Sequence, residues 1–314
     1  MKAIQIQKFG PPSVMELMDI SMPSMQDDQV LIRIKAAGIN PIDYKVRSGG
    51  PSIAPRLHVS FPFGLGYDFS GEIIEVGKKA AHSKKGDLVF GTVGFPSNPG
   101  CYQEYIAASP KTIALKPKSL SFEEAAALGT AATTAYQVIE KTGVKPGMHV
   151  LIHAGAGGVG HLTVQVAKAK GAYVSATASK KNHAFLRSLG VDNPIDYHKE
   201  DFIEVLKEGV DVIVDLIGKD IGKQSLQILK KDGVLISVPT AQVNLIVDEA
   251  KKQGKKALSF VQSPSREIFD QLAALTEKGQ LRVQLGRTFS LQEAAYAHEE
   301  LEKGHFVGKS VFSL

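Results

Sequence analysis

The residues most clearly suited to chemistry form a glycine-rich run in the middle of the 314-residue chain. Six consecutive residues make up this run: Gly155, Ala156, Gly157, Gly158, Val159 and Gly160. The glycines at 155, 157 and 160 match the Gly-x-Gly-x-x-Gly pattern, in which backbone amides can approach a pyrophosphate without an intervening Cβ. An apolar segment at 149–154, expected to be a strand, precedes the run, and helical apolar spacing follows at 159–170. A helix beginning here would direct unpaired N–H groups and its positive dipole end at phosphate. The alternative is a tight turn without a ligand, but the strand–turn–helix context favours a dinucleotide site.

The residues after the next expected strand favour NADPH over NADH. An NAD site usually ends that strand with Asp or Glu, which binds the ribose 2′-hydroxyl. Here the strand expected at 173–178 is followed by Ser179, Lys180, Lys181 and Asn182, without a carboxylate. A carboxylate would repel a 2′-phosphate, whereas a lysine ammonium pairs with it. If both lysines only face solvent, the missing acid still argues against NADH.

Strands and helices alternate around these motifs. We expect strands at 149–154, 173–178, 194–196, 210–216 and 233–238, and helices at 159–170, 180–189, 202–208 and 225–229. This order predicts a doubly wound α/β arrangement, in which helices cover both faces of a parallel sheet. A strand at 256–261 would end that sheet, and its exposed edge would need covering.

The segments before and after this region have a different pattern of apolar, glycine and proline residues. Short β-rich runs at 2–7, 29–36, 70–76 and 87–91, interrupted by Gly and Pro, predict a mostly-β or barrel-like unit. Glu124 follows Ser121 at capping-box spacing, so a helix is predicted to begin there. The tail ends in a strand-like run at 307–312 that we expect to return to the first unit. The predicted domains are therefore 1–118 with 280–314, and 119–279.

Composition narrows the possible classes of function. The single cysteine, Cys101, excludes an internal disulfide and a cysteine-based structural zinc site, and we expect it to be a small core residue. The net charge is only +5, and the short lysine clusters lack interleaved aromatic residues, which argues against a nucleic-acid partner. No apolar run is long enough to span a bilayer, and the first residues alternate like a strand rather than a signal peptide. We therefore expect a cytoplasmic protein without a membrane partner.

Several motifs in order along the chain resemble those of one family. They lie at residues 38–49, 66–71, 86–89, 126–128, 133–136, 155–160 and 308–311. Together they resemble the medium-chain dehydrogenase/reductase superfamily, specifically its zinc-independent NADPH:quinone oxidoreductase and enone reductase branch. The resemblance implies a GroES-like catalytic domain, a Rossmann domain that binds NADPH, and an active site in the cleft between them. It also implies a quinone or enone substrate and a homodimer formed by pairing of the last sheet edge.

The resemblance also implies roles for individual residues. The positions of the catalytic zinc ligands in zinc-dependent relatives correspond to Asn40, Tyr67 and Thr130, none of which is a usual zinc ligand. We therefore expect no metal. Thr134 corresponds to a residue beside the nicotinamide. Tyr197 corresponds to a tyrosine on the 2′-phosphate, although it could equally be a packed residue at a strand end.

Without a metal, side chains must stabilise the negative charge that develops on the substrate oxygen. Asn40, Lys45 and Tyr67 could donate to it. Each also has a structural alternative: Asn40 could only shape the turn before Pro41, Lys45 could face solvent, and Tyr67 could fill the space left by the metal. Lys45 matches enone reductases, and the sequence departs here from those quinone reductases that have tyrosine at this position. Asp43 and Arg47 have the i, i+4 spacing of an ion pair on one helical turn. The alternative functions are an enoyl-thioester reductase, or a non-catalytic NADPH sensor or RNA-binding protein.

Overall fold

The computed structural model describes residues 1–50, 55, 57, 59–81, 83–94, 99–239, 243–304 and 307–314. It divides into two compact units, Met1–Thr133 with Gln262–Leu314, and Thr134–Val261. The first division falls within helix α2 (Phe122–Thr142), whereas the sequence places a boundary before this helix. Helix α8 (Arg266–Glu277) belongs to the first unit because it packs against strand β8 (Ile113–Leu115) of that unit.

The first unit is built on a mostly antiparallel seven-stranded sheet, with the order β15-β16-β3-β5-β6-β8 and β7 paired to β3. Its remaining strands are β3 (Val30–Ile39), β5 (Asp68–Val76), β6 (Leu88–Thr92), β7 (Tyr105–Ala108), β15 (Leu285–Phe289) and β16 (Lys309–Ser313). A smaller sheet contains β2 (Met15–Asp19), β1 (Lys2–Ile6) and β4 (Phe63–Gly64).

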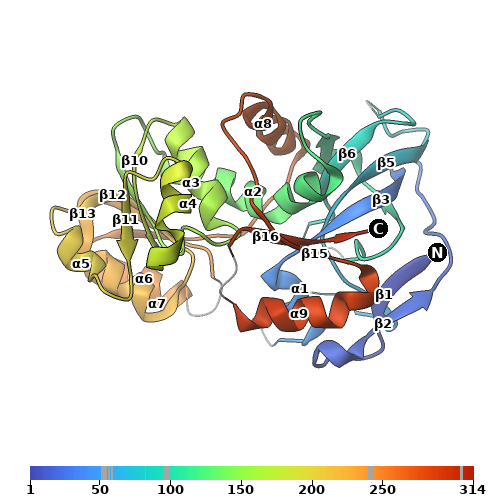
Figure 1. Ribbon diagram of the computed structural model, residues 1–314, viewed down its shortest axis with the longest axis horizontal. Coiled ribbons are helices and arrows are strands. Elements are labelled where there is room, and N and C mark those ends of the chain that lie inside the picture. Colours follow the sequence, from blue (N-terminus) through green and yellow to red (C-terminus); the bar gives the residue numbers. More distant parts are fainter. Residues whose placement is uncertain are drawn as a thin grey trace. The chain divides into compact units, whose positions relative to one another are not determined.

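The predicted return of the chain's tail to this unit is confirmed. Strand β16 lies antiparallel to β3, with Val311 opposite Gly38 (Figure 1). Helix α9 (Ala294–Lys303) precedes β16 and contacts the short helix α1 (Pro41–Arg47), which follows β3. The end of the chain therefore completes both the sheet and the helical cover of the unit formed by its beginning.

The capping box predicted at the start of α2 is confirmed. The Glu124 backbone N–H donates to Ser121 Oγ at 3.1 Å, and the Ser121 N–H donates to Glu124 Oε2 at 2.8 Å. These two bonds satisfy amides that have no partner within the first helical turn.

The second unit contains a six-stranded parallel sheet with the order β11-β10-β9-β12-β13-β14. Its strands are β9 (His149–Ile152), β10 (Tyr173–Ala178), β11 (Asn193–Asp196), β12 (Val210–Asp215), β13 (Leu229–Ser237) and β14 (Lys256–Ser259). Its helices after α2 are α3 (Gly160–Ala169), α4 (His183–Ser188), α5 (Phe202–Val205), α6 (Lys219–Ser225) and α7 (Val243–Lys252). Helices α3 and α4 lie together in Figure 1, away from α6 and α7. The predicted doubly wound sheet is confirmed, and its strand order is that of a Rossmann fold.

One helix prediction in this unit is wrong. The sequence predicts a helix at 225–229, whereas α6 ends at Ser225 and a 3-10 turn spans Leu226–Ile228. Asp215 explains the earlier start, because its Oδ1 accepts the N–H groups of Ile217 and Gly218 just before α6. The helix also contains Gly222, and glycine has a low helix propensity, so the sequence pattern did not indicate a helix here. A side chain would not fit at this position, because a Cβ at Gly222 would lie 2.6 Å from Asp215 Oδ2.

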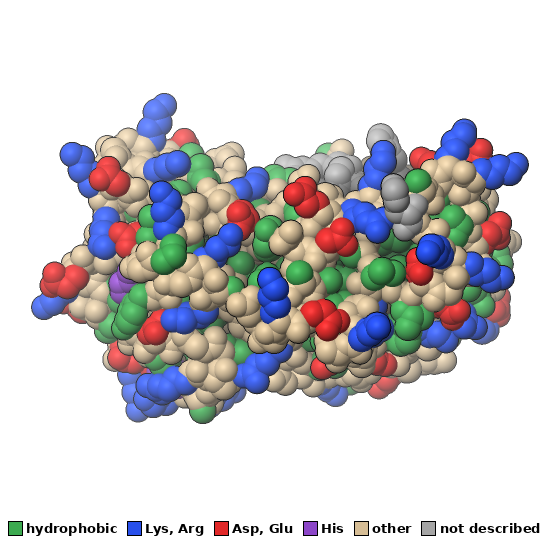
Figure 2. Space-filling view, turned by 90° about the horizontal axis from the view of Figure 1, so that it is seen from above, with side chains coloured by type: hydrophobic (Ala, Val, Ile, Leu, Met, Phe, Trp, Pro, Cys, Tyr) green, Lys and Arg blue, Asp and Glu red, His purple; other side chains and the backbone are tan. Residues whose placement is uncertain are grey.

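Among the residues with described structure, no helix has the length and apolar character needed to cross a membrane. Figure 2 shows basic side chains interspersed with acidic and apolar ones over the visible face.

Candidate functional site

The expected dinucleotide-binding residues gather at one edge of the parallel sheet. Parallel strands end at the same edge, which is where ligands bind in this class of fold. The glycine-rich run follows β9, Ser179 and Lys180 follow β10, and Tyr197 follows β11. Because β9, β10 and β11 are neighbours, these residues share one edge. Thr134 lies in α2 of the same unit and is buried.

The three fingerprint glycines have different structural requirements. A Cβ at Gly155 would lie 2.8 Å from the Cβ of Ala176 on β10, and one at Gly160 would lie 2.2 Å from the carbonyl oxygen of Ala154. Both glycines are therefore needed for the close packing of strand, loop and helix. A Cβ at Gly157 would meet only that same oxygen, at 3.3 Å, among the described atoms within 4 Å. Gly157 thus leaves space that the chain's own packing does not use, which fits a closely approaching pyrophosphate.

The loop backbone itself is strained. Ala154 has φ = 52°, a left-handed conformation that is uncommon for a residue with a Cβ. Its carbonyl oxygen accepts the Gly157 N–H at 3.0 Å, which closes the turn. A left-handed residue held beside a glycine loop is typical of functional sites.

The part of this edge formed by the ends of β10 and β11 fits a phosphate better than a free ribose hydroxyl. Ser179 is half-buried and accepts a hydrogen bond from Asn182 Nδ2 at 3.3 Å, while Lys180 is exposed. Tyr197 is 51% exposed, so it is not a packed core residue, and its ring lies 4.2 Å from that of His198. Asp196, which directly precedes Tyr197 at the end of β11, is buried and accepts the His198 N–H. The end of β10 therefore offers a hydroxyl and an ammonium group.

Asn40 lies in the other unit, where it caps α1 and joins a buried polar network. It is 2% exposed, and its Nδ2 donates to Asp68 Oδ2 at 2.8 Å. Its Oδ1 accepts from Lys309 Nζ at 2.5 Å. Thr130 binds the same carboxylate twice, through its N–H to Oδ2 at 2.8 Å and its Oγ1 to Oδ1 at 2.6 Å. Asn40 and Thr130, two of the positions expected to replace zinc ligands, thus meet on Asp68.

Burial opposes the charges of this network. It raises the pKa of Asp68, although Lys309 and the hydrogen bonds from Thr130 and Asn40 act in the opposite direction. It lowers the pKa of the Lys309 ammonium, which Asp68 and Asp43 partly offset. The cation and the carboxylates therefore depend on one another.

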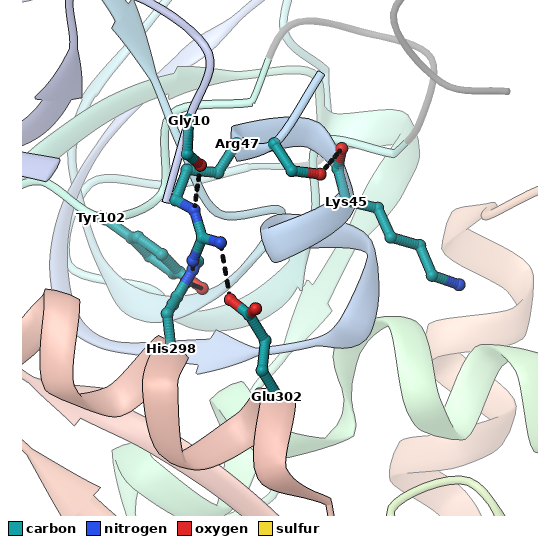
Figure 3. A network of polar contacts seen from close by, with 7 residues as sticks. Gly10, Lys45, Arg47, Tyr102, His298 and Glu302 are labelled. Carbon is teal, nitrogen blue, oxygen red and sulfur yellow. Dashed lines mark hydrogen bonds and ion pairs between the residues drawn. The ribbon is translucent and has the colours of Figure 1, made fainter. Parts of the chain in front are cut away.

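The other two expected catalytic residues differ in environment. Tyr67 is 1% exposed, and burial together with the nearby Asp43 charge raises its pKa further above neutral pH, where a tyrosine hydroxyl is protonated in any case. Lys45 is partly buried, which lowers its pKa. Figure 3 shows its side chain extending away from the Arg47 network. The Lys45 side chain thus takes no part in the network drawn around Arg47.

The predicted ion pair between Asp43 and Arg47 does not form. Asp43 Oδ2 instead accepts from the Asn40 N–H and from Tyr102 Oη, both at 2.7 Å, and burial raises its pKa to about 7. Arg47 binds Glu302 Oε1 at 2.6 Å and the carbonyl oxygen of Gly10 at 3.1 Å (Figure 3). The helical spacing misled the prediction because the two side chains leave α1 toward different partners.

Sequence reasoning gave no role to Asp68, Lys309 or the partners of Arg47. Asp68 and Lys309 lie within motifs already noted, at 66–71 and 308–311, but their contacts depend on the return of the tail. Cys101 is fully buried in the core, as predicted. Within the part of the chain that the structure describes, no group of three or more His, Cys, Asp or Glu side chains could hold a metal ion.

Comparison with known proteins decides the family. The family described as "Alcohol dehydrogenase GroES-like domain" matches residues 26–118, and "Zinc-binding dehydrogenase" matches 189–312. A 2-methylene-furan-3-one reductase of Solanum lycopersicum is 35% identical, over 99% of this chain and 78% of that protein. A quinone oxidoreductase of Sus scrofa is 34% identical, over 96% of this chain and 94% of that protein. The chain belongs to the quinone oxidoreductase and enone reductase branch of the medium-chain dehydrogenase/reductase superfamily. It is an oxidoreductase.

Solved structures of this superfamily have the same fold. The quinone oxidoreductase of Coxiella burnetii is 47% identical with a TM-score of 0.96, over 100% of this chain and 99% of that one. The quinone oxidoreductase of Escherichia coli, solved in complex with NADPH, is 29% identical with a TM-score of 0.86, over the full length of both chains. The resemblance seen in the sequence, and the expected pairing of a GroES-like domain with a Rossmann domain, are confirmed.

Proposed function

We propose that this protein is an NADPH-dependent, zinc-independent reductase that transfers hydride to quinones or α,β-unsaturated carbonyls. The observation that carries the proposal is the glycine loop beside a strand that is followed by Ser179 and Lys180 rather than by an acid. Support comes from an Arabidopsis thaliana relative named as an NADPH-dependent alkenal/one oxidoreductase, 33% identical over 99% of this chain and 79% of that protein. The zinc-independent part rests on Asn40, Tyr67 and Thr130 at the expected ligand positions.

NADPH would be held by residues of the second unit. The pyrophosphate would lie on the amides of Gly155–Gly160 and the start of α3, the 2′-phosphate beside Ser179, Lys180 and Tyr197, and the nicotinamide beside Thr134. When bound, the dinucleotide supplies the hydride. The protein contributes chiefly by bringing the two reactants together in a fixed orientation, an effect that can account for many orders of magnitude in rate.

In the first unit, we propose three donors for the substrate oxygen. As hydride adds to the electron-poor carbon, negative charge develops on the conjugated oxygen, and aimed donors lower the barrier. Asn40 would donate through its amide and Tyr67 through its phenol hydroxyl, which is protonated at neutral pH. Lys45, whose pKa burial lowers, would supply an ammonium near the substrate.

Titration and turnover test this function together. NADPH and NADH are titrated separately into the purified protein, and turnover is then followed with quinones, alkenals, enones and an enoyl thioester. We expect NADPH to bind at least tenfold more tightly and to be oxidised with a quinone or an enone. Equal affinity for NADH would contradict the assignment of Ser179, Lys180 and Tyr197. Turnover of the thioester alone would favour the enoyl-thioester alternative, and binding without any turnover would favour a sensor. Stoichiometric zinc in the purified protein would contradict zinc independence.

We also propose a cytoplasmic homodimer paired through β14. This strand ends the parallel sheet, and an exposed edge invites pairing. Ala257 and Leu258 on β14 are only partly buried, and Val261 just beyond it is 62% exposed. Light scattering at working concentration should give twice the 33.7 kDa chain mass, and a monomer would contradict the proposal.

A further inference from the structure

Four side chains from distant parts of the sequence form one buried cluster in the first unit, which we call the amide clamp: Asn40, Asp68, Thr130 and Lys309. They come from the β3–α1 junction, the start of β5, helix α2 and the start of β16. Asp68 is fully buried, and Asn40 and Lys309 are at most 5% exposed. Burying a lysine and a carboxylate is costly unless each is paired, so the cluster calls for an explanation.

The contacts of Asn40 show which atom of its side-chain amide accepts a hydrogen bond and which one donates. Lys309 can only donate, so the atom it contacts at 2.5 Å must be the amide oxygen. The other end, Nδ2, donates one hydrogen to Asp68 at 2.8 Å. The amide nitrogen carries two hydrogens, and the described structure assigns the second to no protein acceptor. Asn40 can therefore offer a ligand one N–H, and its oxygen is already engaged.

The contact from Lys309 strengthens that remaining donor. An ammonium on the amide oxygen draws electron density from the group, and hydrogen bonds in a chain polarise one another in a low-dielectric interior. Lys309 is also fixed by a second bond, from Nζ to the carbonyl oxygen of Ile39 at 2.7 Å. The donor is thus polarised and held before any ligand arrives, which is the arrangement that stabilises developing negative charge.

Asp68 has little freedom to release the amide. A Cβ at Gly38 would lie 2.9 Å from the Cβ of Asp68, and a Cβ at Gly129 would lie 2.3 Å from its carboxylate carbon. The carboxylate therefore occupies space left open by two glycines, one on β3 and one on α2. Its bonds to Thr130 then fix its rotation.

We propose that Asp68 and Lys309 are positioning residues that orient the Asn40 amide so that its free N–H donates to the oxygen of the substrate. This inference rests on the proposed function, because it takes a quinone or enone oxygen as the acceptor. Thr130 anchors Asp68, which gives this former ligand position a structural task rather than a catalytic one.

A double-mutant cycle tests the coupling between Lys309 and Asn40. We would measure kcat and KM with 1,4-benzoquinone and 3-buten-2-one at saturating NADPH for Asn40→Ala, Lys309→Met and the double variant. Losing one donor of this type costs about 100-fold in kcat, so we expect about that loss for Asn40→Ala and at least tenfold for Lys309→Met. In the Asn40→Ala background, Lys309→Met should change kcat less than twofold, since there is no amide left to position. The exposed Lys85→Met serves as a matched control and should change neither constant.

A second readout does not depend on turnover. The Asn40 side-chain amide is observed by ¹⁵N–¹H NMR and assigned by its loss in Asn40→Ala. The proton donated to the Asp68 carboxylate should resonate downfield and should move upfield in Asp68→Asn, which keeps the shape but removes the charge. Thr130→Val, which loses only the 2.6 Å bond to Asp68, gives a milder variant should Lys309→Met fail to fold, and should lower kcat severalfold.

The outcomes separate this inference from the proposed function. Two results would overturn the positioning role alone, provided that the wild-type protein turns over. The first is that Lys309→Met lowers kcat equally in the wild-type and Asn40→Ala backgrounds. The second is that the Asn40 side-chain resonance does not shift in Asp68→Asn. No turnover with either probe would overturn the proposed function and, with it, the substrate oxygen as the acceptor. Coupled losses together with the expected NMR shifts would support both.

Discussion

The space at Gly157 allows cofactor binding to be separated from folding with a single methyl group. In Gly157→Ala the only described atom that the new Cβ would meet is the Ala154 oxygen, at 3.3 Å, and Gly157 does not have a positive φ. Replacing glycine by alanine in an unstrained conformation stabilises a protein by about 0.4–1 kcal/mol, which offsets this tight contact. We therefore expect the free energy of unfolding without cofactor to change by less than about 1 kcal/mol.

The same methyl would stand where the pyrophosphate must approach the amides. Losing one hydrogen bond to a charged group costs about 1.5–3 kcal/mol. At about 1.4 kcal/mol for each factor of ten, the dissociation constant for NADPH should rise about 10- to 150-fold. The assays are calorimetric titration of NADPH and chemical denaturation of the cofactor-free protein.

Gly155→Ala is the matched control, since it adds the same methyl two residues earlier. There the Cβ would lie 2.8 Å from the Cβ of Ala176, inside the packing of loop and strand. Overpacking of this kind costs about 1–3 kcal/mol, so this variant should lose stability. If Gly157→Ala lost stability but bound NADPH like the wild type, the loop would not be a phosphate site and the reasoning would be refuted.

Three further predictions concern charge. Ser179→Asp should improve binding of NADH relative to NADPH at least tenfold in parallel titrations, because a carboxylate accepts the ribose hydroxyls and repels a 2′-phosphate; an unchanged ratio would contradict the proposed 2′-phosphate site. Burial raises the pKa of Asp43 from 3.8 to about 7, so the folded state keeps a proton that the unfolded state releases. The stability that this group contributes should therefore be lost as the pH rises from about 4 to 7. The melting temperature of the wild-type protein should fall over this range relative to that of Asp43→Asn. Wild type and variant melting temperatures that change with pH in parallel would contradict the raised pKa. Arg47 also donates to His298 Nδ1 at 3.0 Å. Arg47→Met should lower the free energy of unfolding in urea by about 2–4 kcal/mol, because this nitrogen and the Gly10 carbonyl oxygen would lose a buried donor. A loss below about 1 kcal/mol would show that water replaces the donor.

The fold was predictable where local pattern and tertiary structure agree. Strands β9, β10 and β12 of the second unit are short runs largely buried on both faces, and the predicted segment 173–178 coincides with β10. The capping box at Ser121 is a contact between residues three apart, so sequence spacing alone reveals it. Helix α6 was misplaced because the carboxylate of Asp215 determines where it begins, and Gly222 is present to make room for that carboxylate. A helix whose start depends on a buried side chain from the preceding strand has no local signal.

The candidate site divides in the same way. The meeting of the expected cofactor residues was predictable, because a parallel sheet brings the ends of neighbouring strands such as β9, β10 and β11 to one edge. No comparable rule predicts from the sequence that the residues of the amide clamp meet. Lys309 reaches Asn40 only because β16 pairs with β3, and Thr130 reaches Asp68 only because Gly38 and Gly129 leave space for the carboxylate. From sequence, Asn40 could be a turn residue or a donor. The structure makes these compatible, since its backbone caps α1 while its side chain enters the network. One residue can serve both purposes because a helix cap engages the backbone and leaves the amide to be oriented by charges from elsewhere in the chain. Those charges, rather than the residue type at position 40, determine whether the amide donates or accepts.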